Sequence, residues 1–313
     1  MHQLNYSDCN LQLKQVNGNS ISMVQFLTFR NDGLTLEERM TRLPYNNAWE
    51  SSGKYQGDIV LDDPLIEDMV NAYASNNRHA YIVPNTKWPG NTAIYEFGVG
   101  EFDLAQQKFI LTCMNVLSEH TCVKYRLRTA SDRNFVRITG NSDGCYAHVG
   151  YWSGRPINTL NLARATPGQG CLDATVIVHE WLHAFGFFHM HSTHNRDDYV
   201  RIQWENIQNG QAFAFDRYDS WTVSNLGIPY EYGSCMHYDS HAFSSNGKPT
   251  ISPTKVPNAI LGPTHFMTGY DVLRLARHYN CPGAWSAEAM EKARSTIYVP
   301  QEDGTMTAQE VDL

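Results

Sequence analysis

The stretch HEWLHAFGFFH, residues 179–189, decides which class of fold this chain belongs to. His179 and His183 are four residues apart, so on an α-helix both imidazole rings project from the same face. Two neutral imidazole nitrogens at that spacing can bind one Zn²⁺ at about 2.0–2.1 Å. Residues 173–186 are therefore predicted to form a helix that carries two metal ligands and that Gly186 can end.

A third ligand cannot come from the next turn of that helix, because Gly186 and Phe187 stand there and neither side chain binds zinc. Gly186 can adopt a positive φ, and the resulting sharp turn brings His189 back toward the metal. Three protein nitrogens leave one coordination position for water, which is typical of a catalytic zinc site. Zinc lowers the pKa of that water, so Glu180 is suited to accept its proton and later to pass it to a leaving amine.

The HExxH pattern alone also fits surface histidines on an amphipathic helix. A second stretch, YGSCMHY at residues 232–238, supplies the methionine-containing turn that accompanies the longer zinc motif. Met236 is apolar and polarizable, so it can lie beneath a histidine site without competing for the ion. The two stretches together favour a zinc enzyme, and His189 argues against a peptidase whose third ligand is a distant glutamate.

Composition limits the partners that the chain can have. Of its 313 residues 42% are hydrophobic and 18% are charged, as in a globular protein. The net charge is −8 and no long Lys/Arg run occurs, so neither nucleic acid nor an anionic membrane surface is expected as a partner. No stretch is apolar enough to span a membrane, and the first ten residues lack the apolar core of a signal peptide.

The order of predicted elements indicates three parts: residues 1–78, 79–282 and 283–313. Residues 71–78 (NAYASNNR) are small and polar, as in an exposed, cleavable linker. Asp103 can cap a helix, with Gln106 completing a capping box. Short runs of β-forming residues predict strands within 92–99, 123–128, 134–139, 146–151 and 159–162. Irregular stretches then run to Cys281. We expect an α+β fold of two subdomains that flank a cleft, with a loosely attached C-terminal tail.

Several stretches resemble the astacin family of metzincin zinc peptidases, from about Trp88 to Cys281. They are FFH (187–189), NRDDYV (195–200), WENI (204–207) and SCMHY (234–238). The resemblance implies a secreted zinc-dependent endopeptidase that acts on proteins or peptides extended along an edge strand near residues 146–150. It implies zinc ligands at His179, His183 and His189, Glu180 as the general base, and Tyr238 as a tyrosine that can coordinate zinc and stabilise the oxyanion. Without the resemblance, Tyr238 could equally be a packed core tyrosine.

The resemblance also implies disulfides from Cys122 to Cys281 and from Cys145 to Cys171. Of the seven cysteines, Cys9, Cys113 and Cys235 are then left over. Cys113 lies on the apolar face of its predicted helix, which indicates a buried free thiol. Cys9 could pair with any of the others.

The stretch YQGDI, residues 55–59, resembles the aspartate motif of astacin precursors, with Tyr55 in place of Phe. It implies that Asp58 occupies the water position on the zinc and keeps the enzyme latent. Read alone, the same residues would form a Gly-Asp turn. Cys9 is a rival latency ligand, although its neighbours do not match a cysteine switch. Activation is expected after Arg78, by a protease that prefers basic residues, with His79 as the first mature residue.

Some positions depart from the family. Met190 replaces the glutamate that anchors the mature N-terminus, and Thr193 and Asn195 replace a common arginine and aspartate. A charged latch for that terminus is therefore not expected. His191 and His194 fit no ligand spacing and are predicted to be solvated. The alternative function is a catalytically silent, zinc-bound binding module, which the intact zinc motif disfavours.

Overall fold

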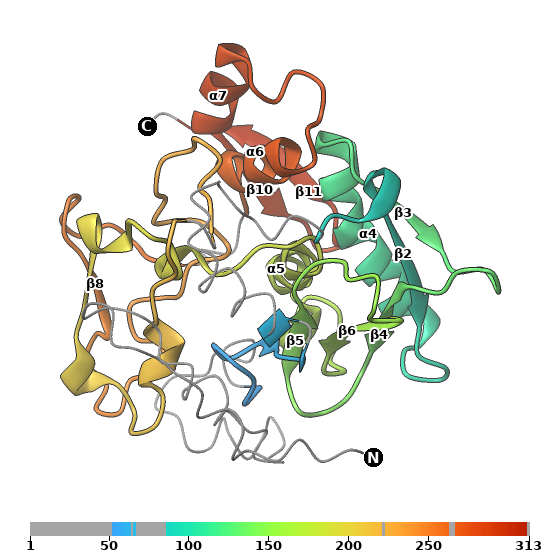
Figure 1. Ribbon diagram of the computed structural model, residues 1–313, viewed down its shortest axis with the longest axis horizontal. Helices are drawn as coiled ribbons and strands as arrows, with labels where there is room; N and C mark the ends of the chain where they lie inside the picture. Colours follow the sequence, from blue (N-terminus) through green and yellow to red (C-terminus); the bar gives the residue numbers. More distant parts are fainter. Residues whose placement is uncertain (1–51, 64, 67–85, 221–222, 263–266, 312–313) are drawn as a thin grey trace, which may run out of the picture.

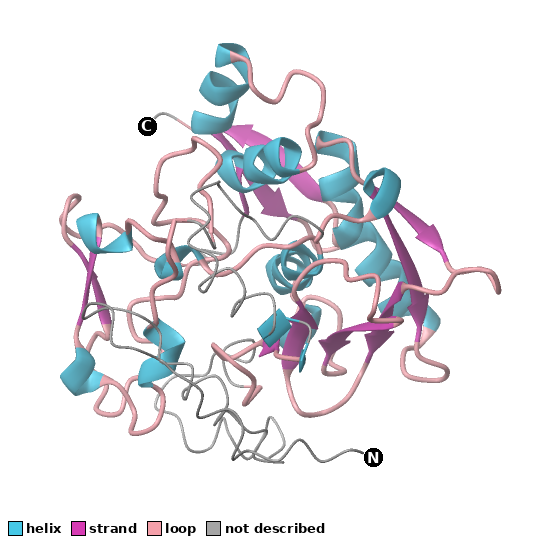
Figure 2. Cartoon of the chain, in the orientation of Figure 1, coloured by secondary structure: helices cyan, strands magenta, loops and turns pink. Residues whose placement is uncertain are grey.

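The computed structural model describes residues 52–63, 65–66, 86–220, 223–262 and 267–311. Cys9, the predicted linker and the predicted cleavage site after Arg78 lie outside the described residues. Figure 1 shows the zinc-motif helix near the centre, with a sheet on one side and irregular chain on the other. Figure 2 shows that the regular helices and strands lie mainly on the sheet side and toward the C-terminal end of the chain.

The principal sheet has six strands in the order β1-β5-β6-β4-β2-β3. Its strands are β1 (Ile59–Val60), β2 (Thr92–Phe97), β3 (Lys124–Leu127), β4 (Phe135–Thr139), β5 (Cys145–His148) and β6 (Ile157–Leu162). Strand β5 is antiparallel to β6, whereas the other neighbouring strands pair in parallel. Five of the strands confirm predicted ones. Strand β1 was not predicted, and it pairs with β5, the strand expected to hold substrate.

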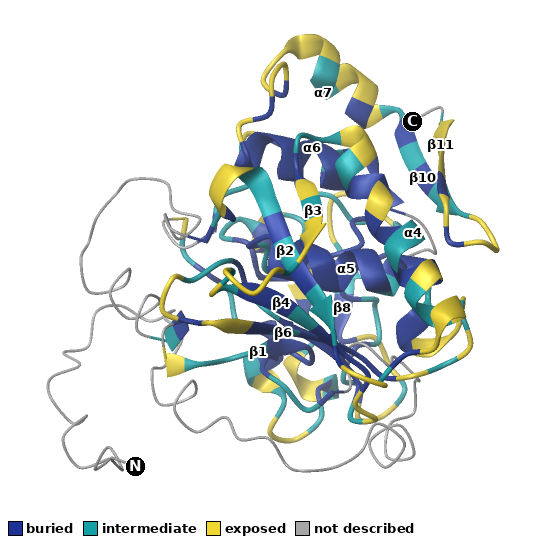
Figure 3. Ribbon diagram, turned by 90° about the vertical axis from the view of Figure 1, so that its right-hand side faces the viewer, coloured by how far each residue is buried: buried dark blue, intermediate teal, exposed yellow. Residues whose placement is uncertain are grey.

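Two helices, α4 (Leu104–His120) and α5 (Ala174–Ala184), pack together against this sheet. The predicted capping box is present at α4, where the backbone N–H of Gln106 donates to the Asp103 carboxylate at 2.8 Å and the backbone N–H of Asp103 donates to the Gln106 side chain at 3.0 Å. The buried face of α4 holds Phe109, Ile110, Cys113, Met114, Val116 and Leu117. Figure 3 shows buried residues along α5 and through β4 and β6, so the metal motif lies on an element that the core holds in place.

Beyond the zinc motif the chain is irregular, as predicted, up to residue 262. Its regular elements are short: η4 (Met190–Ser192), η5 (Arg196–Asp198), η6 (Trp204–Asn206), η7 (Ala212–Phe215), and the antiparallel pair β7 (Val200–Ile202) and β8 (Ile251–Pro253). Helix α6 (Gly269–His278) was missed. Its buried residues include Arg274 and Arg277, whose charges hide the apolar periodicity that would have revealed the helix.

The prediction of a loosely attached tail was wrong. Helix α7 (Ala287–Arg294) packs on α6, and β10 (Thr296–Pro300) lies between β11 (Met306–Glu310) and β9 (Met267–Thr268) in a second sheet. Tyr298 and Met306 are only 4% and 8% exposed. The acidic, polar composition of the tail concealed these few apolar anchors, which dock it onto the rest of the fold.

Both implied disulfides are present, Cys122–Cys281 and Cys145–Cys171. The first closes a sequence separation of 159 residues, for which restriction of the unfolded chain contributes a few kcal/mol. Among the described residues Cys113 and Cys235 are free and buried. Burial raises the pKa of the Cys113 thiol, which fits the prediction of an unreactive core residue.

Candidate metal centre

Helix α5 places the first two candidate ligands. It begins at the N-cap residue Asp173, whose carboxylate accepts a hydrogen bond from the backbone N–H of Thr175 at 2.8 Å. The rings of His179 and His183 lie 4.7 Å apart between centroids, and both residues are buried. The four-residue spacing therefore brings the two imidazoles together as predicted.

Gly186 turns the chain after the helix, with a φ of 108°. A Cβ at this position would also approach Nε2 of His278 and Oγ1 of Thr86, each at 3.1 Å. Glycine is thus favoured both by the backbone conformation and by the space available. The turn places the ring of His189 4.8 Å from that of His183, so all three predicted histidine ligands converge.

Asp58 joins the three histidines. One ligand atom from each of these four buried residues lies within 4.8 Å of the others. The Asp58 carboxylate is 3.0 Å from Nε2 of His179, 3.2 Å from Nε2 of His189 and 3.4 Å from Nε2 of His183. The predicted latency ligand therefore reaches the centre across 121 residues of sequence from His179.

The hydrogen bonds on the other side of each ring fix the tautomers. Nδ1 of His179 lies 2.7 Å from the carbonyl of Cys235, and Nδ1 of His183 lies 2.7 Å from the carbonyl of Phe187. Nδ1 of His189 lies 3.1 Å from the side-chain oxygen of Gln56. Because these oxygens only accept, each Nδ1 carries a proton, and in a neutral ring Nε2 then presents a lone pair toward Asp58.

This donor set fits a zinc ion. Burial lowers the pKa of His179, and it lowers the pKa of His189 to about 4, so these imidazoles are neutral near pH 7. Three nitrogen lone pairs and a carboxylate, all buried and directed at one point, repel each other unless a cation lies between them. Neutral imidazole and carboxylate are the ligands that Zn²⁺ takes in tetrahedral sites.

Glu180 lies beside this centre on α5 and is fully buried. Among the described residues neither of its carboxylate oxygens has a hydrogen-bond partner. Burial, and secondly the charge of Asp58, raise the pKa of Glu180 well above its usual value. A buried carboxyl group with unused hydrogen-bonding capacity and a raised pKa is suited to carry a proton.

Tyr238 is also fully buried, and its ring centroid lies 4.9 Å from that of His189. Its hydroxyl donates a hydrogen bond to the backbone carbonyl of Gln56. The side chain of the same glutamine donates to the hydroxyl of Ser192 at 3.1 Å and accepts from His189. Sequence reasoning missed Gln56, because an unspecified position inside a short motif carries no chemical signal.

The methionine turn supports the centre from the protein side. The carbonyl of Met236 accepts a hydrogen bond from the backbone N–H of Met190 at 2.8 Å, next to the third ligand. Asp271 on α6 accepts from the hydroxyl of Ser234 at 2.5 Å and from the backbone N–H of Cys235 at 3.0 Å. The role of Asp271 could not be predicted, because helix α6 itself was missed.

The prediction that His191 is solvated was wrong. His191 is fully buried, its Nε2 donates to the carbonyl of Ala214 at 3.0 Å, and its ring lies 3.7 Å from that of Tyr238. His194 is half-buried. The 3₁₀ turns after His189 fold this stretch inward, which a helical or strand periodicity cannot reveal.

Met190 is 5% exposed and packs in the main hydrophobic core. The absence of a charged latch for the mature N-terminus stays a prediction. The predicted N-terminal residue of the mature enzyme, His79, lies outside the described residues.

A three-histidine zinc site on an HExxHxxGxxH motif, with a methionine turn, defines a zinc peptidase of the metzincin class. Residues 80–280 match the model of the peptidase family described as Astacin, and this match covers more than half of the chain. The chain therefore belongs to the astacin family and is a zinc metalloendopeptidase by class.

Individual relatives support the same family assignment. The chain is 33% identical to zinc metalloproteinase nas-4 of Caenorhabditis elegans over 74% of its own length and 70% of the relative. It is 32% identical to seminal metalloprotease 1 of Drosophila melanogaster over 74% of its length and 88% of the relative. Other relatives are longer; for example, the match spans 41% of nas-15 from C. elegans.

Among solved structures, a hatching enzyme zinc-protease of Oryzias latipes (high choriolytic enzyme 1) matches with a TM-score of 0.56 and 32% identity. The match covers 62% of this chain and 93% of that one. The similarity confirms the predicted α+β metzincin fold of the catalytic part. Within the described residues, no helix combines the length and the apolar character needed to cross a membrane.

Proposed function

We propose that this chain is the latent precursor of a secreted zinc endopeptidase that hydrolyses peptide bonds in proteins. In this proposal, residues 1–78 are a propeptide, residues 79–282 are the catalytic domain and residues 283–313 are a C-terminal extension. The observation that carries the proposal is the convergence of the Nε2 atoms of three buried histidines on Asp58, with Glu180 buried beside them.

Zinc bound by His179, His183 and His189 would polarise the scissile carbonyl and lower the pKa of a water molecule. Glu180 accepts a proton from that water as general base and transfers it to the nitrogen of the leaving amine. The hydroxyl of Tyr238 donates a hydrogen bond to the oxyanion that develops on the substrate carbonyl. Tyr238 can do so only after its hydroxyl is released from the carbonyl of Gln56.

Latency follows from the residues that the N-terminal segment places in the site. Asp58 occupies the position that water needs, and Gln56 holds both Tyr238 and His189. Strand β1 pairs with β5, where Ile59 lies opposite Ala147. The N-terminal segment therefore occupies the edge of β5 along which a substrate would bind. Cleavage after Arg78 by a protease that prefers basic residues would allow this segment to leave.

Secretion is supported by the two disulfides, because such bonds persist in oxidising compartments. The relatives whose printed names are seminal metalloprotease and hatching enzyme agree with an enzyme that acts outside the cell.

The proposal is tested with the zinc-loaded full chain after limited trypsin treatment, compared with a Glu180→Ala variant and a control variant at the exposed Glu205 (Glu205→Ala). Cleavage of unstructured protein substrates, zinc content and the new N-terminus are measured together. We expect one zinc per chain in all three proteins and a loss of at least about 10³-fold in kcat/KM for Glu180→Ala alone. Activity that survives in this variant would remove Glu180 from its role. A zinc-loaded wild-type protein that cleaves nothing would favour the binding module instead.

A further inference from the structure

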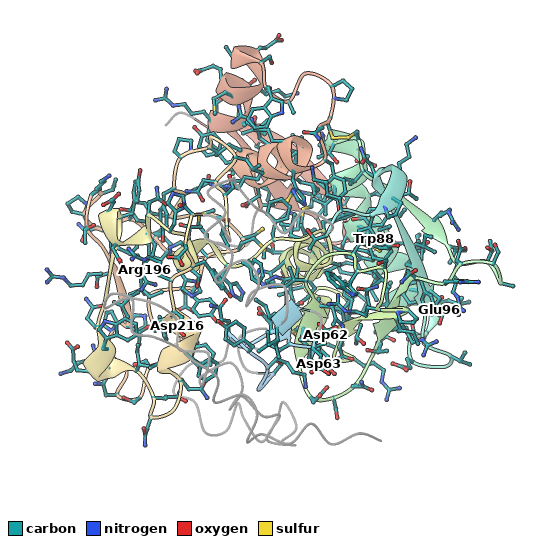
Figure 4. The ribbon with its side chains drawn as sticks, in the orientation of Figure 1. Asp62, Asp63, Trp88, Glu96, Arg196 and Asp216 are labelled. Atoms are coloured by element: carbon teal, nitrogen blue, oxygen red, sulfur yellow. A yellow bond between two sulfur atoms is a disulfide. The ribbon has the colours of Figure 1, made fainter. Side chains whose placement is uncertain are left out.

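Asp62 of the N-terminal segment forms an ion pair with Arg155, a residue that the proposed mechanism does not use. Nη2 of Arg155 donates to Oδ1 of Asp62 at 2.8 Å, and Nε of Arg155 donates to Oδ2. The pair is therefore a two-pronged guanidinium–carboxylate contact, the geometry that gives arginine its preference for carboxylates. The side chain of Arg155 is 7% exposed and that of Asp62 is 22% exposed. Figure 4 shows Asp62 beside strand β1, on the sheet side of the molecule and away from Asp216 and Arg196.

The remaining nitrogen of Arg155 is held by residues of the catalytic part itself. Nη1 donates to Oδ1 of Asn158 at 2.9 Å and to the carbonyl of Gly150 at 3.2 Å, and it lies 3.5 Å from the carbonyl of Val149. These contacts do not depend on the N-terminal segment. The guanidinium is therefore already oriented, with Nε and Nη2 directed at the place where the Asp62 carboxylate lies.

His148 on strand β5 completes the surroundings of that carboxylate. The backbone N–H of Thr159 donates to Nδ1 of His148 at 2.9 Å, so the ring carries its proton on Nε2. Nε2 lies 3.7 Å from Oδ2 of Asp62. Burial and the neighbouring Arg155 lower the pKa of His148 to about 4, so near pH 7 it is a neutral N–H donor. A carboxylate here meets one fixed cation and a directed N–H group.

The position of this carboxylate relative to the metal centre follows from the strand pairing. Val60 lies opposite His148 in the parallel pairing of β1 with β5, and Asp62 follows two residues later. Asp62 is four residues beyond Asp58, which corresponds to about 13 Å of extended chain. When the N-terminal segment leaves, a substrate on the same edge of β5 would pass the same guanidinium.

We propose that Arg155 and His148 form a subsite that selects an acidic side chain about four residues from the scissile bond. The proposal rests on the proposed function, because it assigns part of the substrate specificity of that enzyme. In the precursor, Asp62 fills the subsite as a substrate side chain would. Removal of the segment leaves two donors of a preoriented arginine without their carboxylate, and an acidic residue of the substrate restores both hydrogen bonds.

The test uses the trypsin-activated full chain and a peptide in which it cleaves one mapped bond. Variants of this peptide carry either Glu or Gln at a single position, placed in turn two to six residues from that bond on each side. We expect Glu to exceed Gln by about tenfold in kcat/KM at one position three to five residues away. The side on which the preference appears gives the direction of the substrate along β5.

Three enzyme variants test whether Arg155 causes the preference for Glu over Gln. The Glu/Gln ratio should fall to about one in Arg155→Gln, take an intermediate value in Arg155→Lys, and remain unchanged in Arg201→Gln, which alters an exposed arginine on β7. The ratio compares two peptides within one preparation, so partial loss of folded enzyme does not affect it. A preference that persists in Arg155→Gln, or no preference at any position, would overturn the subsite.

A binding measurement gives a readout that does not need catalysis. Labelled peptides of residues 52–66, either native or with Asp62→Asn, are titrated into the activated chain with and without Arg155→Gln. We expect Asp62→Asn to weaken binding about tenfold to the wild type and not at all to Arg155→Gln. Equal losses on both enzymes would contradict the pairing of Asp62 with Arg155. The effect of Asp62 would then come from its other contacts, with Nε2 of His148 at 3.7 Å and the backbone N–H of Leu65 at 3.1 Å. If no peptide is cleaved but this coupling is present, the proposed function fails while the subsite stands.

Discussion

The hydroxyl of Tyr238 donates a hydrogen bond to the backbone carbonyl of Gln56, a residue 182 positions earlier in the chain. Gln56 has a φ of 48°, in the left-handed region that non-glycine residues seldom adopt. The same residue is hydrogen-bonded to His189 and Ser192 through its side chain. The N-terminal segment therefore blocks the metal through Asp58 and also restrains the tyrosine proposed to stabilise the transition state.

Replacement of Asp58 by alanine should activate the uncleaved full chain. The variant loses the carboxylate that faces all three histidines, while the pairing of β1 with β5 remains. We expect peptide hydrolysis by uncleaved protein to rise at least about tenfold, since loss of a charged contact weakens the closed state by about 1.4 kcal/mol or more. The measurement is hydrolysis before and after trypsin. Asp63→Ala is the control, because Asp63 is an exposed aspartate of the same N-terminal segment. Equal activation by both variants would exclude a specific role for Asp58.

Removal of the Tyr238 hydroxyl should reduce catalysis without removing zinc. In Tyr238→Phe, kcat/KM of the activated enzyme is expected to fall about 10²–10³-fold, as for loss of one oxyanion donor. Zinc content should be unchanged, because the three histidine ligands remain. Tyr232→Phe is the matched control: its hydroxyl donates to the carbonyl of Tyr199 at 2.7 Å, in a contact that involves none of the proposed catalytic or metal-binding residues. Unchanged kinetics in Tyr238→Phe would show that the hydroxyl does not stabilise the oxyanion and that Tyr238 serves only in packing.

The C-terminal extension should contribute to the stability of the catalytic part. Gly304, in the turn between β10 and β11, has a φ of +88°, and an added Cβ would lie 3.0 Å from the ring of Phe109 and 3.1 Å from Sγ of Cys113 on α4. Gly304→Ala therefore combines backbone strain with overpacking, and we expect it to lower the free energy of unfolding by about 2–4 kcal/mol.

The variant Gly283→Ala separates the effect of backbone strain from that of overpacking. Gly283 has a similar φ of +78°, but no atom lies within 4 Å of an added Cβ. This variant should lose only about 1 kcal/mol in urea-induced unfolding. Equal losses at the two glycines would indicate that the extension does not press on α4.

The parts of the fold and of the site that could be predicted from the sequence depend on residues close together in the chain. The ligands His179, His183 and His189 follow from helical spacing and one glycine turn, and the capping box at Asp103 follows from two residues. Residues that act through distant partners carry no such signal. Asp271 and His191 gain their roles only when α6 and the 3₁₀ turns fold against the centre, and the tail docks through a few apolar side chains within a polar composition. Burial of this kind is decided by tertiary packing.

A largely buried acidic group next to the methionine turn should give the protein a specific pH dependence. Glu231 accepts a hydrogen bond from the hydroxyl of Thr268 at 2.8 Å and pairs with Arg274 at 3.2 Å, and its side chain is 17% exposed. Burial, followed by the nearby charge of Asp271, raises the pKa of Glu231 from 4.5 to about 7. The folded protein therefore holds this proton more tightly than the unfolded chain does.

The sign of the effect follows from linkage. Between about pH 4.5 and 7 the unfolded chain has released the proton of Glu231 while the folded protein still binds it, so stability falls as the pH rises through this window. Glu231→Gln stays neutral and avoids this loss. Its unfolding free energy should be close to that of the wild type at pH 4.5 and higher by up to about 3 kcal/mol at about pH 8. Urea unfolding of the zinc-loaded full chain at both pH values measures the difference, with Glu205→Gln as the exposed control. If Glu231→Gln were instead less stable at the higher pH, the ionised carboxylate would be a net stabilising partner of Arg274, and Glu231 would not retain its proton behind the metal centre.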